Sequence, residues 1–429
     1  MIAPRGGVAF VVDLEHRDVR HEAIRRRAVP VFLASSEEDA VARPNKLDLA
    51  PAALADSDAF GDPDRLAVRV RMPRCARTRG ESTARRGADT VGSVTDEYLV
   101  DVVGREIAVT SPGKLFFSER GETKLDLVAY YLAVEEPLMR AVGGRPTLMQ
   151  RFPHGAEGSS FFQKRVPETA PEWLQTTIVS TPNGTTSRAL VLADMAHVVW
   201  AVNLACLGFH VWPYLRDRPE AVDELRLDLD PQPGVDFNDV RAAADELRRL
   251  LDEHEMVGYP KTTGNRGLHV YVRLQPRWDA YQVRAAAVAA ARELERRRPE
   301  LITAAWWKEE RGRRVFVDYN QNAPHKTVFG AWSVRARPGA QVSAPLTWDE
   351  LNDLHPDELT IASVPERLTA RGDPWEGMND QPQSLEPLLA RHERDRAAGL
   401  MDAPWPPVYP KQPDEPPRVA PSRARKDAR

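Results

Sequence analysis

The chain has very little cysteine: only Cys75 and Cys206 occur among its 429 residues. Neither has the spacing of a metal-ligand motif, so a cysteine-based metal site is not expected, and a reduced cytoplasmic setting fits this usage. The sequence also lacks an apolar run of about 18 residues, so no membrane span is indicated. Its first residues hold a short apolar stretch followed at once by acids, which makes a poor signal peptide.

An excess of positive charge is missing as well. The formal net charge is −4, which argues against an indiscriminately basic nucleic-acid coat. A local basic groove is still compatible with this charge, because binding depends on where the cations lie. A weak overall field predicts modest affinity that falls steeply with salt. The groove would have to gather Lys114, Lys124, Lys164, Arg165, Arg335 and Arg337.

The chain does have enough apolar residues, 42%, for a substantial core, and its length suits one large or two medium domains. Residues 1–93 lack sustained periodicity and are rich in Ala, Asp and Arg, so we expect a disordered extension; the alternative is an arginine-rich nucleic-acid-binding arm. Residues 94–395 alternate strand-like and helix-like segments and are expected to form the folded domain. Residues 396–429 are rich in Pro and Arg and predict a flexible tail, with Trp405 and Tyr409 pinning its first part to the body.

The most informative pattern is VDELRLDLDP, an alternating stretch typical of a strand. Side chains repeat every two residues along a strand, so Asp228 and Asp230 project from the same face, about 7 Å apart. Two acids that repel each other call for a cation, and hard carboxylate oxygens suit Mg²⁺ or Mn²⁺. The pattern D-x-D alone is weak, because acids are common in this chain, and a solvated strand edge explains it equally well.

Two further strands strengthen the pattern. In RRVFVDYN the alternation places Phe316 and Asp318 on one side, although a lone Asp at a strand end is more often a turn former. The strand GLHVYVRL carries His269 on its polar face and follows KTTGNRG. Glycines, hydroxyls and cations before a strand can cradle an anion, but this is no P-loop, and an ordinary turn is the simpler interpretation.

In chain order, the sequence carries the segments VTSPGKLFFSERGETKLDLVAYY, FFQKRVP, GFHVWPY, LDLDP, KTTGNRGLHVYV, FVDYNQN and SVRARPGA. Taken together and in this order, they resemble the polymerase domain of bacterial DNA ligase D, within the archaeo-eukaryotic primase-polymerase superfamily. The resemblance covers roughly residues 95–395 and implies an α/β (α+β) fold with mixed or antiparallel sheets and flanking helices. The first two acids and the third would then come from neighbouring strands.

The resemblance implies template-directed nucleotidyl transfer by a two-metal mechanism. Asp228, Asp230 and Asp318 match the family's ligands for two divalent ions, Mn²⁺ or Mg²⁺, one activating a primer 3′-hydroxyl and one neutralising the triphosphate. The positions that match contacts to the incoming NTP or dNTP are Lys164, His210, Thr263, His269 and Arg335. For the histidines the alternative is a structural role, and for Arg335 a surface cation.

Ser111, Lys114 and Lys124 match the family's pocket for a DNA 5′-phosphate on the downstream side of a gap. Two lysines and a hydroxyl suit a phosphate, because lysine binds it as a point charge. The family usually has Asn where this chain has Ser111, and Thr263 replaces a usual serine. Lys124 also opens an expected helix, KLDLVAYYLAVEEPLMRAV, and would be merely solvated there.

The leading functional hypothesis is therefore a DNA-repair polymerase that acts on gapped, nicked or broken DNA, with tolerance of or preference for ribonucleotides implied by the resemblance. The alternatives are a DNA-end binding or bridging protein with vestigial polymerase activity and, less favoured, a metal-dependent phosphoesterase. A ligase motif of the K-x-D-G type is absent, so sealing would need a separate ligase, and a DNA-end binding ring protein is a further candidate partner. Such a role implies a cytoplasmic, nucleoid-associated protein without membrane contact.

Overall fold

A computed structural model describes residues 70–71, 97–420 and 422. The extension expected for residues 1–93 lies outside the described residues, apart from the two-residue strand β1 (Val70–Arg71). Among the described residues, no helix combines the length and apolarity needed to cross a bilayer.

The first described part is a hairpin followed by two helices. Strands β2 (Glu97–Val102) and β3 (Arg105–Thr110) pair antiparallel, and so do the short β4 (Leu115–Phe117) and β5 (Glu122–Thr123). Thr123 then caps α1 (Lys124–Ala133) in a capping box with Asp126, which satisfies N–H groups at the start of the helix. Helix α2 (Glu135–Val142) ends at glycines, so the chain turns back into the next sheet.

That next sheet has the strand order β16-β10-β6-β9-β8, with β7 pairing to β6. Its described pairings are antiparallel. Gly208 of β10 is required by packing, because a Cβ there would lie 2.3 Å from the ring of Phe329. The strands are β6 (Pro146–Arg151), β7 (Phe161–Gln163), β8 (Thr176–Ser180), β9 (Thr186–Val191), β10 (Cys206–Val211) and β16 (Val328–Phe329), with α3 (Met195–Asn203) between β9 and β10.

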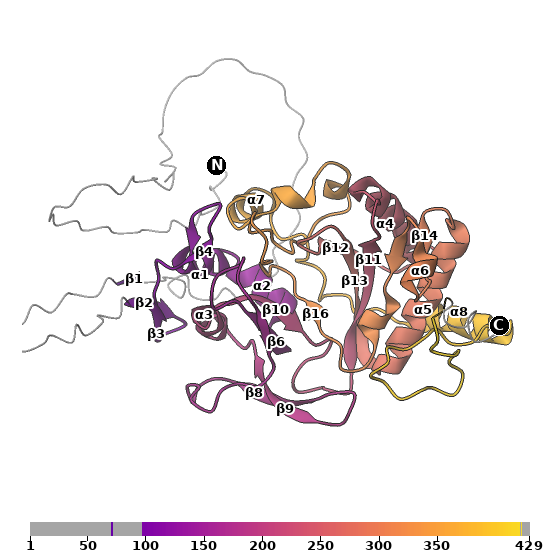
Figure 1. Ribbon diagram of the computed structural model, residues 1–429, viewed down its shortest axis with the longest axis horizontal. Helices are drawn as coiled ribbons and strands as arrows, with labels where there is room; N and C mark the ends of the chain where they lie inside the picture. Colours follow the sequence, from indigo (N-terminus) through magenta and orange to yellow (C-terminus); the bar gives the residue numbers. More distant parts are fainter. Residues whose placement is uncertain (1–69, 72–96, 421, 423–429) are drawn as a thin grey trace, which may run out of the picture. The chain divides into compact units, whose positions relative to one another are not determined.

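A second sheet, of order β12-β13-β11-β15-β14, is antiparallel except for the β14–β15 pair. Helices α4 and α5 pack against it, and Figure 1 shows them on the same side of β11 and β13. Asp236 caps α4 and Asp279 caps α5, each in a capping box. The elements are β11 (Val222–Pro231), α4 (Phe237–Asp252), β12 (Tyr259–Thr262), β13 (Leu268–Trp278), α5 (Ala280–Arg297), β14 (Ile302–Thr303), α6 (Lys308–Arg311) and β15 (Val315–Val317).

The remaining chain adds short elements and a closing segment. They are the 3₁₀ turns η2 (Tyr319–Asn322), η3 (Glu350–Asn352) and η4 (Pro356–Glu358), and the helices α7 (Ser363–Arg371) and α8 (Glu386–Ala397). Thr347 and Glu350 exchange capping-box bonds at the start of the 3₁₀ turn η3.

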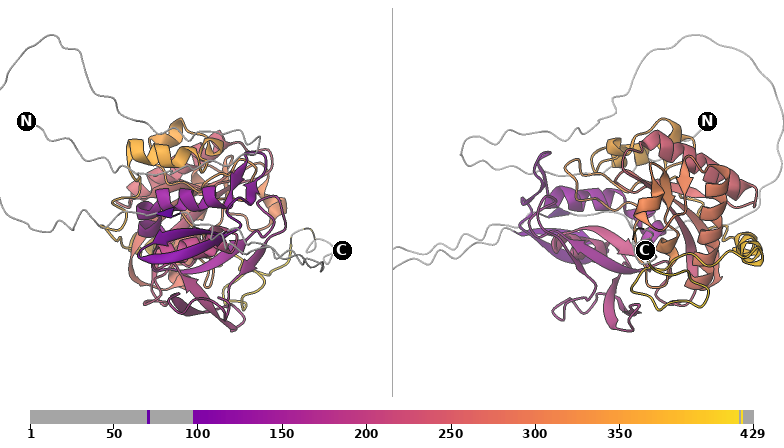
Figure 2. Two further views of the ribbon diagram at one scale, coloured as in Figure 1. Left: turned by 90° about the vertical axis from the view of Figure 1, so that its left-hand side faces the viewer. Right: turned by 45° about the vertical axis from the view of Figure 1, so that its right-hand side comes forward.

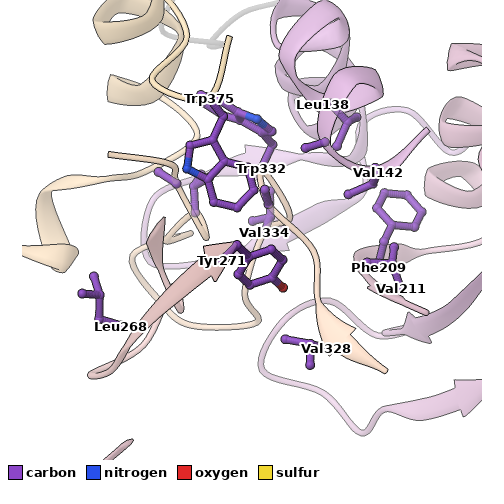
Figure 3. Packing of buried hydrophobic residues seen from close by; sticks show 14 of the residues in the cluster. Leu138, Val142, Phe209, Val211, Leu268, Tyr271, Val328, Trp332, Val334 and Trp375 are labelled. Carbon is purple, nitrogen blue, oxygen red and sulfur yellow. The ribbon is translucent and has the colours of Figure 1, made fainter. Parts of the chain in front are cut away.

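Buried aromatic residues join the two sheets. Trp332 is fully buried and its carbonyl accepts a hydrogen bond from the hydroxyl of Tyr130 at 2.8 Å. In Figure 3, Trp332 and Val334 lie above Tyr271 of β13, with the labelled residues of α2 and β10 to their right. The core is therefore continuous between the two sheets.

A buried charge network crosses the same junction. Glu224 of β11 is 1% exposed and accepts hydrogen bonds or ion-pair contacts from Arg145 (3.0 Å), Arg226 (2.6 Å) and Arg273 (3.1 Å). Arg226 also donates to the carbonyl of Val211 at 2.9 Å. One carboxylate thus ties the end of β10 and the start of β6 to the second sheet.

The α+β fold with mixed and antiparallel sheets expected from the resemblance is confirmed. The end of the domain differs from the expectation: the boundary set at residue 395 falls inside α8, which packs against α5. Beyond it, residues 402–418, here called the C-terminal strap, carry no helix or strand, yet Trp405 and Tyr409 are buried. The contacts expected of these two rings are present: both pack on Ala323, and the hydroxyl of Tyr409 donates to the carbonyl of Pro324.

Candidate active site

The three aspartates meet at one edge of the β11–β15 pair. Leu229 is paired with Val317 and Asp230 with Phe316, so the next position places Asp228 opposite Asp318. The backbone N–H of Asp318 donates to the carbonyl of Asp228 at 2.9 Å, which confirms this position. The leucines of β11 are fully buried against the core, so the alternating side chains point the acids the other way. The neighbouring-strand arrangement expected from the resemblance is confirmed.

Burial and mutual repulsion disfavour the charged form of all three carboxyls. Burial raises the pKa of Asp228 to about 6, against the attraction of Lys261 and Arg335. Burial, followed by the charge of Asp228, raises the pKa of Asp318 to about 7 and also raises the pKa of Asp230. Carboxylates placed this way are stabilised by a cation.

Polar groups contact the carboxylate oxygens of Asp318 and Asp228. The side-chain amide of Gln321 donates to Oδ2 of Asp318 at 3.0 Å, and the backbone N–H of Asn320 donates to Oδ1 at 3.0 Å. Nε2 of His269 lies 3.3 Å from Oδ1 of Asp228. Within the described ranges no three His, Cys, Asp or Glu side chains form a ready metal cluster. The donor chemistry still fits Mg²⁺ or Mn²⁺, since these ions take carboxylate oxygens.

The positively charged side chain of Arg335 lies near the acids. Nε of Arg335 donates to the carbonyl of Thr263 at 2.8 Å, and its guanidinium lies 3.5 Å above the ring of Phe329. Burial lowers the pKa of Arg335 to about 10, so it stays charged at neutral pH. Gly264 has φ +67°, and a Cβ there would lie 2.7 Å from Arg335 and 3.1 Å from the N–H of Ser343, which explains glycine in this turn.

Thr263 holds the turn together. Its hydroxyl donates to the carbonyl of Gly267 at 3.2 Å and accepts from the N–H groups of Asn265 (3.2 Å) and Gly267 (3.3 Å). The hydroxyl is thus engaged within the turn, with the side chain 7% exposed.

Both candidate histidines are neutral. Burial, then the charges of Arg335 and Lys261, lowers the pKa of His210 to about 3, and burial with Lys261 lowers that of His269 well below its usual value. His210 is half-buried on β10 and its ring meets the rings of Phe162 and Phe329 edge-on, at 5.1 Å each. Neutral imidazoles can donate to phosphate oxygens or bind a metal.

Lys164 follows β7 and is half-buried, which lowers its pKa. Burial, then the charge of Lys164, lowers the pKa of His325. The two phenylalanines before it are exposed, Phe161 by 46% and Phe162 by 56%. Exposed aromatic rings of this kind suit base stacking.

Sequence reasoning missed Lys261 and Gln321. Lys261 is fully buried, its Nζ donates to Oγ of Ser343 at 2.6 Å, and its charge acts on both Asp228 and His269. The period of two along β12, which places Lys261 on the face of Thr263, could have found it. Gln321 follows the third acid in a 3₁₀ turn, and no periodicity indicates that its amide folds back.

Ser111, Lys114 and Lys124 come together in a second cluster, built by the turn before β4 and the start of α1. The N–H of Lys114 donates to the carbonyl of Ser111 at 3.1 Å, and that of Lys124 to the carbonyl of Lys114 at 2.8 Å. Ser111, with φ +49°, and Lys114 are exposed. Lys124 is buried rather than solvated; its Nζ donates to Thr110 and Asn203, and burial, then Lys114, lowers its pKa to about 8.

Comparison with known proteins identifies similar chains. Residues 123–375 match the family model described as LigD, primase-polymerase domain. The chain is 32% identical to the multifunctional non-homologous end joining protein LigD of Mycolicibacterium smegmatis over 269 residues, 62% of this chain and 35% of that protein. It is 33% identical to the bifunctional LigD of Bacillus subtilis over 287 residues, 66% and 46% of the two. The chain thus spans less than half the length of these curated relatives.

A solved structure is similar over nearly its whole length. The polymerase domain from Mycobacterium tuberculosis Ligase D, in complex with DNA, matches with a TM-score of 0.61 and 30% identity. The match covers 65% of this chain and 99% of that one.

Proposed function

The chain belongs to the LigD primase-polymerase domain family, whose members are nucleotidyltransferase enzymes of DNA repair, and we propose that it fills short gaps or extends ends by template-directed nucleotidyl transfer. The observation that carries this proposal is the cross-strand placement of Asp228 and Asp318, with Asp230 beside them, facing the cations of the KTTGNRG turn and Arg335.

Each group has a distinct task in this proposal. Asp228, Asp230 and Asp318 hold two divalent ions, Mn²⁺ or Mg²⁺. When bound, these ions make the 3′-hydroxyl of the primer more acidic and neutralise charge on the phosphates. Arg335 uses Nε to fix its own orientation on Thr263, which leaves the two Nη groups to face the triphosphate.

The neutral histidines and the aromatic residues complete the nucleotide site. His210 and His269 donate ring N–H groups to the triphosphate without adding charge. Lys164 adds a cation beside the exposed rings of Phe161 and Phe162, on which a base stacks. Ribonucleotide preference is part of the proposal and depends on the shape of this pocket.

The test is incorporation by the wild-type chain on a gapped duplex with a 5′-phosphate, with Mn²⁺ or Mg²⁺ and with ribo- or deoxyribonucleotides. We expect template-directed addition, with ribonucleotides incorporated at least as efficiently as deoxyribonucleotides. If the chain binds DNA but adds no nucleotide with either metal and either kind of nucleotide, the proposal is overturned in favour of a DNA-end binding protein with a vestigial site.

The second cluster is the proposed contact for the downstream 5′-phosphate. Lys114→Ala is expected to weaken binding of a 5′-phosphorylated gap about tenfold, because a hydrogen bond to a charged group is worth about 1.5–3 kcal/mol. Binding of the same duplex with a 5′-hydroxyl should change little. Fluorescence anisotropy with both duplexes measures this, and equal losses on the two would place Lys114 outside the phosphate contact.

The same preference should depend on pH. Lys124 has a lowered pKa of about 8, so its positive charge is present at pH 7 and is lost as the pH rises. The advantage of the 5′-phosphate over the 5′-hydroxyl should therefore shrink between pH 7 and pH 9. A constant advantage over this range would indicate that the charge of Lys124 does not act on the phosphate.

A further inference from the structure

The C-terminal strap is a folded segment that closes on itself. The side chain of Glu415, 3% exposed, accepts from the N–H of Trp405 at 2.8 Å and from that of Gln412 at 3.1 Å, and it pairs with Arg418 at 2.6 Å. The N–H of Asp402 donates to the carbonyl of Asp414 at 2.9 Å. The strap lies beyond the residues that match the family model, which end at 375. The right-hand view of Figure 2 shows this yellow segment running below the orange helices.

Arg284 of α5 binds the strap with most of its guanidinium. Nη1 contacts both carboxylate oxygens of Asp402, at 3.1 and 3.2 Å, and Nη2 donates to the carbonyls of Ala403 (2.8 Å) and Pro404 (3.3 Å). The indole of Trp405 covers the guanidinium face at 3.8 Å. The residue is 1% exposed, so these contacts are made without water.

The one remaining donor of Arg284 points to the acid site. Its Nε donates to Oδ1 of Asn320 at 2.8 Å, and Nδ2 of Asn320 donates to Pro404 of the strap at 3.0 Å. The backbone N–H of Asn320 holds Oδ1 of Asp318 at 3.0 Å. A continuous chain of hydrogen bonds therefore runs from the strap through Arg284 and Asn320 to the third acid.

The strap also fixes the far end of the same turn. The hydroxyl of Tyr409 donates to the carbonyl of Pro324, and Trp405 and Tyr409 pack on Ala323, directly after η2. The strap thus contacts η2 in its middle and just beyond its end, whereas Asp318 caps the beginning. Because η2 is held at both places, the carboxylate of Asp318, which caps it, is held in one position.

From this geometry we infer that Arg284 and the C-terminal strap are positioning elements of the active site, which set the carboxylate of Asp318 for the divalent ions. The inference rests on the proposed function, because it requires Asp318 to be a metal ligand. Groups behind metal ligands typically change metal affinity or activity 10- to 100-fold when they are removed.

The test measures Mn²⁺ binding to the full chain by calorimetry, without DNA, together with kcat and KM for a gapped duplex. In Arg284→Met we expect Mn²⁺ affinity and kcat to fall at least about tenfold, with KM for DNA within about twofold. Arg292→Met is the matched control: it lies on the same helix and donates to the carbonyl of Met401 just before the strap, at 2.6 Å, but among the described residues it makes no hydrogen bond to Asn320 or Asp318. It should bind Mn²⁺ like the wild type.

Asn320→Ala cuts the same chain without removing a buried charge, and it decides the matter if Arg284→Met does not fold by circular dichroism. If Arg284→Met and Asn320→Ala both fold and both bind Mn²⁺ as tightly as the wild type, the inference is overturned. If only one of them folds, wild-type Mn²⁺ affinity in that variant overturns it. Asp318→Asn separates the two ideas: if it too leaves Mn²⁺ binding unchanged, the metal role of Asp318 fails; if it alone weakens binding, only the role of the strap fails.

Discussion

Asp228→Ala is expected to lower nucleotide incorporation at least about 1,000-fold, equivalent to about 4 kcal/mol of transition-state stabilisation. Asp228 lies at the junction of the three acids, opposite Asp318 and 3.3 Å from His269, so no other carboxylate can take its place. Binding of the gapped duplex should stay within about threefold, because the cations proposed to contact DNA lie on other elements. Single-turnover incorporation and anisotropy measure the two effects.

Asp228 contributes to activity but not to the stability of the metal-free fold, and a second substitution tests this. Burial raises the pKa of Asp228 to about 6, so its ionised carboxylate, which predominates at pH 7, lowers the stability of the metal-free fold. Asp228→Asn removes this penalty, and its melting temperature without metal should be at least that of the wild type. Asp217→Ala, an exposed carboxylate before the same strand, is the control and should keep full activity. Substantial synthesis by a clean Asp228→Ala preparation would refute the metal role.

Glu224→Ala is expected to lower the free energy of unfolding by about 3–5 kcal/mol, the usual cost of breaking a buried ion pair from one side. The loss leaves Arg145, Arg226 and Arg273 with an unbalanced buried charge at the junction of the two sheets. Urea unfolding followed by circular dichroism measures it. Glu220→Ala, an exposed glutamate four residues earlier, is the matched control and should lie within about 0.5 kcal/mol of the wild type.

The same glutamate predicts a pH dependence. Burial alone would raise its pKa, but the guanidiniums of Arg145, Arg226 and Arg273 hold it well below the usual 4.5. A lowered pKa stabilises the fold above the unfolded-state value, and this contribution is lost as the pH falls from about 4.5 toward the folded value. Glu224→Gln should therefore unfold with a shallower dependence on acid than the wild type. Identical acid dependence would mean that the network is already broken before unfolding.

The sequence predicts the elements that depend on a repeating pattern. The alternation in β11 places Asp228 and Asp230 on one face. Residues placed by tertiary contacts escape such reasoning. Lys124, for example, is buried only because Asn203 packs over it.

The C-terminal segment illustrates the same limit. Its composition is typical of a flexible tail, and among its residues only Trp405 and Tyr409 indicate that it packs on the body. Order comes from Arg284, more than a hundred residues earlier, which offers Asp402 and Trp405 a buried partner. Local sequence cannot report a partner that lies on another element.

The strap also bears on how the protein is made. During synthesis the ribosome delivers all three acids and their strands before residues 402–418 appear. Until then Arg284 has none of its strap contacts, and η2 lacks the carbonyl that Asn320 binds. The nascent chain therefore carries every acid of the site before the contacts around η2 are complete, and the domain reaches its final packing only after the strap has been synthesised.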